Sequence, residues 1–305
     1  MLFPGQASQY VGMGKDYYDR FPEARDLYRE ANHKLGFDIT ELSFTGDLEE
    51  LTKTHNAQPA ILLHSLVVLS VLDGLKIRPA IVAGHSLGEF SALVAAGFFR
   101  FMDALLIVRK RGELMFESGL ERPGTMAAII GLAEDELARV VEEAGQDGIV
   151  VIANYNSPSQ YAISGEVAAV EKAMVLAKER GAKRAIGLQV SGAFHSPLME
   201  TTIAPLRDYI GKFRHGHVQV PWIANVTGAV VEDEAQVLDL LARQLSSPVR
   251  WVESMQVLAG RAAGPVLEVG PGKVLAGLMK RIDRDANVVN LTSTEDLDSL
   301  TADAM

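Results

Sequence analysis

Residues 84–88 read Gly-His-Ser-Leu-Gly and lie between a short apolar run and the helix-like stretch 89–96. A strand, a glycine-flanked turn that carries a serine, and then a helix form the arrangement that exposes a serine hydroxyl as a nucleophile. Gly84 and Gly88 flank the serine because so tight a turn leaves no room for side chains. The helix that follows directs unpaired N–H groups back at Ser86, where a carbonyl oxygen becomes negative during attack. The segment predicts acyl-transfer chemistry, with a plain structural turn as the alternative.

The composition is that of an ordinary globular protein. Its 305 residues are 48% hydrophobic and 22% charged, enough for one large domain or a large domain with a small insert. The absence of cysteine excludes disulfides, thiolate metal sites and a cysteine nucleophile. The net charge of −10 argues against binders of duplex DNA and of anionic membranes, since both favour basic surfaces. We expect no nucleic-acid partner and no metal site.

The sequence also carries no pattern that indicates a membrane or an export signal. No apolar stretch approaches the roughly 20 uninterrupted residues that a membrane-spanning helix needs. The first residues lack the charged and then hydrophobic regions of a signal peptide. Together these features predict a cytoplasmic protein that does not associate with membranes.

The pattern along the chain changes near Pro123. The part before it is dominated by helical patterns, with one clear strand at 80–83. After it we expect strand 125–130, helix 134–144, strands 149–154 and 161–164, helix 167–180 and strand 184–190. The order β-α-β-β-α-β is that of the ferredoxin-like unit. We therefore predict a small ferredoxin-like domain, 123–191, inserted into a large domain, 1–122 and 192–305.

The chain returns to the large domain at about residue 195. There we expect strands at 221–226 and 266–269 and helices at 235–245 and 274–281. The tail from about Thr292 is rich in Asp, Ser and Thr, and we expect it to be mobile.

A nucleophilic serine needs a base, and the chain has seven histidines. His85 adjoins Ser86, but neighbouring side chains at such a turn point in different directions, so it is a poor candidate for the base. His195 follows the last strand of the insert and precedes a helix that begins with proline. It therefore lies at the boundary between the predicted domains, where small-molecule sites form most often. A hydrogen-bonded surface histidine is the alternative.

Two polar residues occupy the apolar sides of predicted helices. Arg111 lies between Val108 and Met115 on such a side, and a guanidinium buried there needs a partner. The partner is either an internal carboxylate, which the helix alone favours, or the carboxylate of a ligand, which arginine matches through parallel hydrogen bonds. Gln244 stacks on the side of Leu240 and Leu241, and its buried amide must also be hydrogen-bonded.

The chain carries a series of short motifs along nearly its whole length. They are Phe3-Pro4-Gly5-Gln6, residues 84–88, Arg111, Asn154-Tyr155-Asn156-Ser157-Pro158, Gly192-Ala193-Phe194-His195-Ser196, residues 244–251 and Glu268-Val269-Gly270-Pro271-Gly272. Taken together and in this order, they resemble the motifs of the malonyl-CoA:acyl carrier protein transacylases. The resemblance implies an α/β fold in which a large α/β-hydrolase-like domain with a parallel sheet carries the ferredoxin-like insert. Family members have several residues before the first motif, whereas here only Met1 and Leu2 precede it, so we expect a shortened first strand or a numbering that starts inside a longer chain.

The resemblance also assigns roles to individual residues. It implies that Ser86 is the nucleophile and His195 its general base and acid. The backbone carbonyl of Gln244 would orient the histidine in place of an acidic residue. The backbone N–H groups of Gln6 and Leu87 would form the oxyanion hole.

Substrate recognition follows from the same resemblance. Arg111 would pair with the free carboxylate of a malonyl group, and an acetyl group would leave that arginine without its anion. The bulk of Phe194 would crowd a branched acyl group and so disfavour methylmalonyl. Asn154 and His85 complete the substrate-binding positions that the resemblance implies.

The implied reaction is ping-pong transfer of malonyl from malonyl-CoA, through a malonyl-serine ester, to the phosphopantetheine thiol of an acyl carrier protein. We expect no tightly bound cofactor and a monomeric enzyme. The product would serve fatty-acid synthesis or, as an alternative, a polyketide synthase. A serine esterase or thioester hydrolase would need an acidic triad residue and fits less well, as does a non-catalytic docking domain that nevertheless retains Ser86, His195 and Arg111.

Overall fold

A parallel sheet of short, buried strands organises one of the two compact units into which the chain divides. The computed structural model describes residues 1–261 and 264–303, and this first unit comprises Met1–Gly112, Phe213–Ile223 and Leu258–Met305. Its strands follow the order β10-β9-β1-β2-β7 and run parallel to one another. They are β1 (Leu2–Phe3), β2 (Val82–Gly84), β7 (Trp222–Ala224), β9 (Val266–Val269) and β10 (Val288–Leu291).

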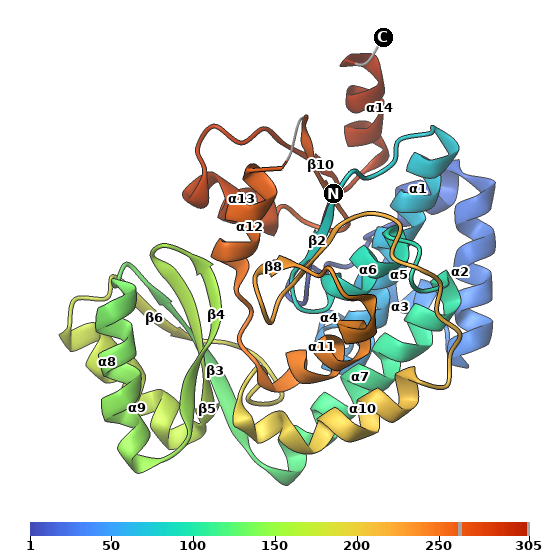
Figure 1. Cartoon of the computed structure of the whole chain (residues 1–305). Coiled ribbons are helices and arrows are strands. Elements are labelled where there is room, and N and C mark those ends of the chain that lie inside the picture. The colour runs from blue at the N-terminus through green and yellow to red at the C-terminus, as the bar shows by residue number, and fades with distance from the viewer. Residues whose placement is uncertain (262–263, 304–305) are drawn as a thin grey trace. The chain divides into compact units, whose positions relative to one another are not determined.

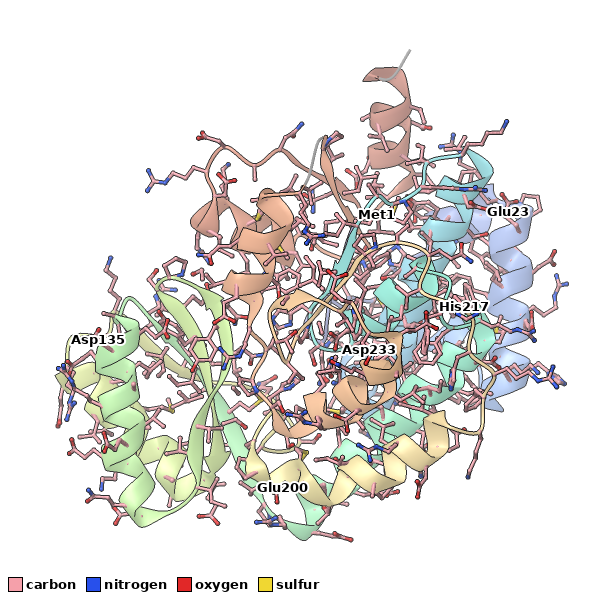
Figure 2. The ribbon with its side chains drawn as sticks, viewed as in Figure 1. Met1, Glu23, Asp135, Glu200, His217 and Asp233 are labelled. Carbon is pink, nitrogen blue, oxygen red and sulfur yellow. The ribbon has the colours of Figure 1, made fainter. Side chains whose placement is uncertain are left out.

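Strand β1 lies in the middle of this sheet, between β9 and β2. Leu2 pairs with Ala83 on one side and with Glu268 on the other, and the strands are buried, as parallel strands covered on both faces are. The amino group of Met1, labelled in Figure 2, donates a hydrogen bond of 2.7 Å to the carbonyl of Ile81. The register brings the carboxyl ends of β1 and β2 to the same edge, the edge at which α/β sheets bind ligands.

The strands of the first unit are separated along the chain by helices. They are α1 (Lys15–Arg20), α2 (Pro22–Leu35), α3 (Ile39–Phe44), α4 (Leu48–Thr52), α5 (Thr54–Gly74), α6 (Gly88–Ala95), α13 (Val274–Ile282) and α14 (Thr294–Asp303). Helix α7 (Phe101–Glu121) begins in this unit and continues into the second. The Asp38 and Asp47 side chains cap α3 and α4 by accepting hydrogen bonds from backbone N–H groups. Exposed acids such as Glu23 on α2 point outward (Figure 2).

Helix α5 is the core helix of the first unit. Among the described residues it is the one helix long and apolar enough to cross a membrane by length and composition. However, 78% of its most apolar window is buried inside the protein, as expected for a helix that is apolar on all sides. The apolar composition of α5 is therefore accounted for by packing within the chain.

His64 in α5 makes the stability of the protein depend on pH. Its side chain is fully buried next to the ring of Tyr17, and burial lowers its pKa to about 4 from 6.5. Between pH 6.5 and 4 the unfolded chain takes up a proton that the folded chain does not, so stability falls as the pH falls through this window. We predict that His64→Leu removes on the order of 3 kcal/mol of this pH dependence, at about 1.4 kcal/mol per pKa unit. Urea unfolding between pH 7 and 4 measures the free energy of unfolding, and the exposed His33→Leu is the control. Equal pH dependence of the free energy of unfolding in wild type and His64→Leu would contradict the prediction.

An antiparallel sheet organises the second unit, which comprises Glu113–Lys212 and Ala224–Val257. Its strand order is β4-β5-β3-β6, and helices α8 and α9 pack together against it (Figure 1). Along the chain the elements are β3 (Gly124–Ile130), α8 (Glu134–Ala144), β4 (Val150–Ser157), β5 (Gln160–Glu166), α9 (Val167–Glu179) and β6 (Arg184–Gly187). The β-α-β-β-α-β order predicted from the sequence is thus confirmed. Leu137, Val140, Ile163 and Val170 form part of its core, while Asp135 on α8 faces outward (Figure 2).

The rest of the second unit consists of short helical segments. They are the 3₁₀ turns η1 (Gly145–Asp147), η2 (Pro197–Thr202), η3 (Glu234–Gln236) and η4 (Gln244–Ser246), the strand β8 (Ala229–Val230) and the helices α10 (Ile203–Ile210), α11 (Val237–Arg243) and α12 (Trp251–Ala259). The helix expected at 235–245 is therefore a short α-helix between two 3₁₀ turns. The strand expected at 184–190 ends at Gly187, three residues early.

The tail is a helix, so the prediction of a mobile segment from Thr292 is wrong for its described residues. The backbone N–H groups of Thr292 and Ser293 donate to the Asp296 carboxylate, a local capping arrangement at the start of α14. The N–H of Thr294 donates to Asp16 at 2.6 Å. Arg20 of α1 forms two hydrogen bonds with Asp298, which adds a further tie to this helix. The polar residues that suggested mobility are the caps and ion pairs that hold the helix.

Candidate active site

Ser86 occupies a sharp elbow between β2 and α6. Its φ of +50° lies in the left-handed region, which a non-glycine residue adopts only at a cost. A Cβ added to Gly84 would lie 1.9 Å from the carbonyl carbon of Gly88, and one added to Gly88 would lie 2.0 Å from the carbonyl oxygen of Phe3. Both glycines are therefore required by close backbone contacts, as the sequence predicted.

The loop after β1 presses against this elbow. The N–H of His85 donates to the carbonyl of Phe3 at 3.0 Å, and a Cβ on Gly5 would lie 2.4 Å from the carbonyl oxygen of His85. The Gln6 side chain, in turn, donates to Thr54 Oγ1 at 3.3 Å. Residues 4–6 are thus held beside the turn that carries the serine.

The backbone N–H groups of Gln6 and Leu87 differ from those of the residues that follow the serine turn, because they lack a hydrogen-bond acceptor within the described residues. The N–H groups of Gly88 and Glu89 bond to turn carbonyls at 3.0 and 3.1 Å. Within the described part of the chain, by contrast, the N–H groups of Gln6 and Leu87 have no protein acceptor. Leu87 directly follows the serine, so its N–H is available to an oxygen bound there.

Arg111 of α7 reaches the serine hydroxyl. Its Nη2 donates to Ser86 Oγ at 3.0 Å, its Nη1 donates to Gln58 Oε1 at 2.7 Å, and the side chain is 1% exposed. Burial lowers the pKa of Arg111 to about 9, and the charge of the buried Glu89 opposes this effect. Since about 9 is above neutral pH, the guanidinium carries its charge beside the Ser86 hydroxyl.

Gln58 and Glu89 were not predicted from the sequence as site residues. Gln58 is fully buried in the otherwise apolar α5, and Glu89 is buried in the first turn of α6. Each is a polar residue on an apolar helix, the same signal that singled out Arg111. Applied to α5 and α6, that criterion would have found both.

His195 of the second unit is held in one tautomer. Its Nδ1 lies 2.8 Å from the carbonyl oxygen of Gln244 and 3.2 Å from that of Ser247. Because both partners are acceptors, Nδ1 carries a proton, and in the neutral ring the lone pair is therefore on Nε2. His195 is 4% exposed, and its backbone has a positive φ of +58°.

Short hydrogen bonds fix the loop that carries His195. The backbone N–H of His195 donates to the carbonyl of Leu245 at 2.9 Å, and Ser196 Oγ donates to the carbonyl of Ala193 at 2.6 Å. Phe194 is buried beside Gly192, where an added Cβ would lie 3.2 Å from its ring. The loop therefore holds the side chains of Phe194 and His195 in place.

Asn154 lies at an irregularity of β4 that joins this strand to the segment after Gln244. It forms a parallel bridge with Val249, whose N–H donates to the carbonyl of Ala153 at 2.8 Å. The carbonyl of Val249 in turn accepts from the N–H of Tyr155 at 3.0 Å. Asn154 and the carbonyls that hold His195 thus belong to one connected framework.

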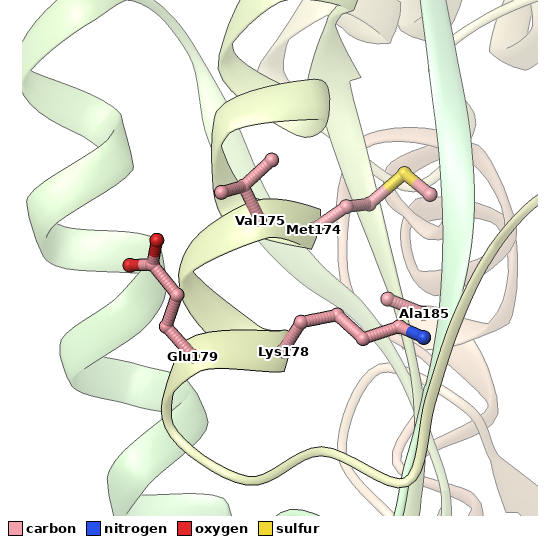
Figure 3. A pocket seen from close by; sticks show the side chains of 5 residues that line it. All are labelled: Met174, Val175, Lys178, Glu179 and Ala185. Carbon is pink, nitrogen blue, oxygen red and sulfur yellow. The ribbon is translucent and has the colours of Figure 1, made fainter.

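The predicted residues form two sets. Gln6, His85, Ser86, Leu87 and Arg111 belong to the first unit, and Asn154, Phe194, His195 and Gln244 belong to the second. A separate depression of about 320 Å³ lies between α9 and β6, lined by Met174, Val175, Lys178, Glu179 and Ala185 (Figure 3). None of the predicted residues lines it. Over residues 1–261 and 264–303, no group of three or more His, Cys, Asp and Glu could hold a metal ion.

Comparison with known proteins places the chain among acyl transferases. Residues 1–295 match the family model described as the acyl transferase domain. The chain is 45% identical, over 97% of its length and 94% of the relative, to the malonyl CoA-acyl carrier protein transacylase of Bacillus subtilis. An acyl carrier protein S-malonyltransferase from Vibrio cholerae has 40% identity and a TM-score of 0.93, with 98% of each chain covered. A malonyl-transacylase solved in complex with a type II polyketide synthase acyl-carrier protein has 39% identity and a TM-score of 0.96, over 99% of this chain and 98% of that one.

Proposed function

Because the chain belongs to the acyl transferase domain family, we propose that it transfers malonyl groups from malonyl-CoA to an acyl carrier protein. Its relatives at 38–45% identity carry this activity in their names, and one structural neighbour was solved with its carrier protein. The observation that supports a malonyl substrate is the hydrogen bond of 3.0 Å between Arg111 Nη2 and Ser86 Oγ. It puts a fixed positive charge beside the atom that is acylated.

The length of a malonyl group suits this contact. Once an acyl group is attached to Ser86 Oγ, the malonyl carboxylate lies one methylene beyond the ester carbonyl. A guanidinium already in contact with Oγ is within reach of that carboxylate and binds it with charge-assisted hydrogen bonds. An acetyl ester offers no anion, so the buried charge of Arg111 loses its ligand.

The chemistry proceeds in two transfers. Ser86 Oγ attacks the thioester carbonyl while Nε2 of His195 accepts the hydroxyl proton, and coenzyme A leaves after that proton passes to its sulfur. The carrier thiol then attacks the malonyl-serine ester by the same steps in reverse. The carbonyl of Gln244 keeps Nδ1 of His195 protonated, so Nε2 is the basic atom.

The remaining predicted residues have roles around the acyl group. The N–H groups of Gln6 and Leu87 form the oxyanion hole that stabilises the tetrahedral intermediate. Phe194 restricts branching at the acyl α-carbon, and Asn154 and His85 contribute to substrate binding. These roles rest on the family resemblance and on the positions of the residues within each unit.

Each of the two sheets defines one proposed domain. We assign 1–122 and 192–305 to an α/β-hydrolase-like domain, supported by the parallel sheet and the serine elbow at its carboxyl edge. We assign 123–191 to a ferredoxin-like domain, supported by the order of β3 to β6. The compact unit around that sheet is wider and also includes 113–122, 192–212 and 224–257.

The enzyme is proposed to act as a cytoplasmic monomer that needs no tightly bound cofactor, with malonyl-CoA as donor substrate. Its product serves fatty-acid synthesis. Service to a polyketide synthase is the second candidate, favoured by the neighbour solved with a polyketide carrier protein. A serine esterase has less support, since His195 Nδ1 donates to backbone carbonyls.

Steady-state kinetics with malonyl-CoA and a phosphopantetheinylated carrier protein test this function. We expect parallel double-reciprocal lines, because coenzyme A leaves before the carrier protein is acylated. Malonyl-carrier protein should be the main product, with little free malonate. Release of malonate at the same rate without the carrier protein would instead identify a hydrolase.

A further inference from the structure

We propose that Gln58 is a positioning residue that fixes the Arg111 guanidinium and thereby sets the preference of the enzyme for acyl groups with a free carboxylate. The inference rests on the proposed function, since it concerns how the malonyl group is selected. Gln58 touches no reacting atom in this proposal and acts through Arg111.

The contact between the two side chains is short and buried. Gln58 Oε1 accepts a hydrogen bond of 2.7 Å from Arg111 Nη1, and the two residues are 0% and 1% exposed. A hydrogen bond from a charged donor in such surroundings is stronger than an exposed one. Gln58 therefore holds one end of the guanidinium.

The guanidinium is planar, so a fixed Nη1 also fixes the direction of Nη2. In this structure Nη2 donates to Ser86 Oγ at 3.0 Å. When Oγ becomes an ester oxygen it is a poorer acceptor, and Nη2 is then available to the malonyl carboxylate. The exchange of Nη2 from hydroxyl to carboxylate requires no movement of Nη1 away from Gln58.

The uncharged amide of Gln58 is suited to this role. An amide oxygen accepts a hydrogen bond without adding a second negative charge to that of the buried Glu89, which already acts on Arg111. A carboxylate at the same place would pair with Arg111 and repel the malonyl carboxylate. The ring of Phe90, 5.7 Å from the guanidinium carbon, borders the cation on another side.

The test compares two substitutions at Gln58 that nearly preserve its volume. Gln58→Met removes the acceptor, and Gln58→Glu keeps the acceptor but adds a charge. The readout is the ratio of kcat/KM for serine acylation by malonyl-CoA and by acetyl-CoA. Gln58→Met should lower this ratio about tenfold, mainly through a higher KM for malonyl-CoA, because losing a hydrogen bond to a charged group costs roughly a factor of ten or more. Gln58→Glu should lower it further.

A matched control lies on the same helix. Leu63→Met introduces methionine at another fully buried position of α5, and we expect the wild-type ratio for it. Circular dichroism confirms that each variant is folded.

The possible results distinguish the role of Gln58 from the proposed malonyl transfer on which it rests. A wild-type ratio in Gln58→Met, or equal losses of malonyl and acetyl transfer in both Gln58 variants, would overturn the role of Gln58 alone. A wild-type enzyme that forms no malonyl ester would refute the proposed function and the inference with it.

Discussion

Replacing His195 with alanine is expected to lower kcat/KM for malonyl transfer about a thousandfold, since a positioned general base contributes roughly 10²–10⁴ in rate. The structure supports this size of effect because the imidazole is buried and held in one tautomer by the carbonyls of Gln244 and Ser247. In the proposed mechanism His195 takes the proton of the Ser86 hydroxyl and then that of the carrier thiol, so its loss is expected to slow both transfers.

Rapid-quench measurement of serine acylation by malonyl-CoA provides the rate, and the exposed His33→Ala is the matched control. Gln244→Ala should have a much smaller effect than His195→Ala, because it retains the backbone carbonyl that accepts from Nδ1. A loss smaller than tenfold in His195→Ala would remove this residue from the catalytic role.

Replacing Arg111 with alanine is expected to lower the preference for malonyl over acetyl by about 10²–10³, the consequence of losing charge-assisted hydrogen bonds in a buried site. Malonyl transfer should fall steeply because its carboxylate would be buried without a counter-charge. Acetyl transfer should fall less, since the acetyl group makes no use of the guanidinium.

Competition between malonyl-CoA and acetyl-CoA for acylation measures this preference directly. Arg109→Ala is the matched control, because Arg109 lies on the same helix but donates to the His55 carbonyl and to Asn56 Oδ1. Equal losses of malonyl and acetyl transfer in Arg111→Ala would show that this arginine does not recognise the carboxylate.

Features encoded in consecutive residues were predictable from the sequence. The elbow at Ser86 was predicted because glycines on both sides of a serine report a local steric requirement, which the close contacts of Gly84 and Gly88 bear out. The antiparallel sheet was predicted because alternating patterns and turn residues repeat over short distances. Arg111 was singled out by helical periodicity, although its hydrogen-bond partners were not.

Features that depend on distant residues were missed. Helical periodicity would single out Gln58 as a polar residue in an apolar helix, but it does not identify the partner of Gln58, because Arg111 lies 53 positions away in the sequence. The tail was judged by its composition, whereas its helix is held by Asp16 and Arg20 from the other end of the chain. In each case the decisive partner is remote.

Intact-mass spectrometry after incubation with malonyl-CoA tests most directly whether Ser86 carries the malonyl group between transfer from the first thiol and transfer to the second. We predict the addition of one malonyl group to the wild-type protein, mapped by peptide digestion to Ser86 and removed by a phosphopantetheinylated carrier protein. Ser86→Ala should gain no such mass. An adduct that persists in Ser86→Ala, or turnover of malonyl-CoA without any adduct on Ser86, would contradict this role of Ser86.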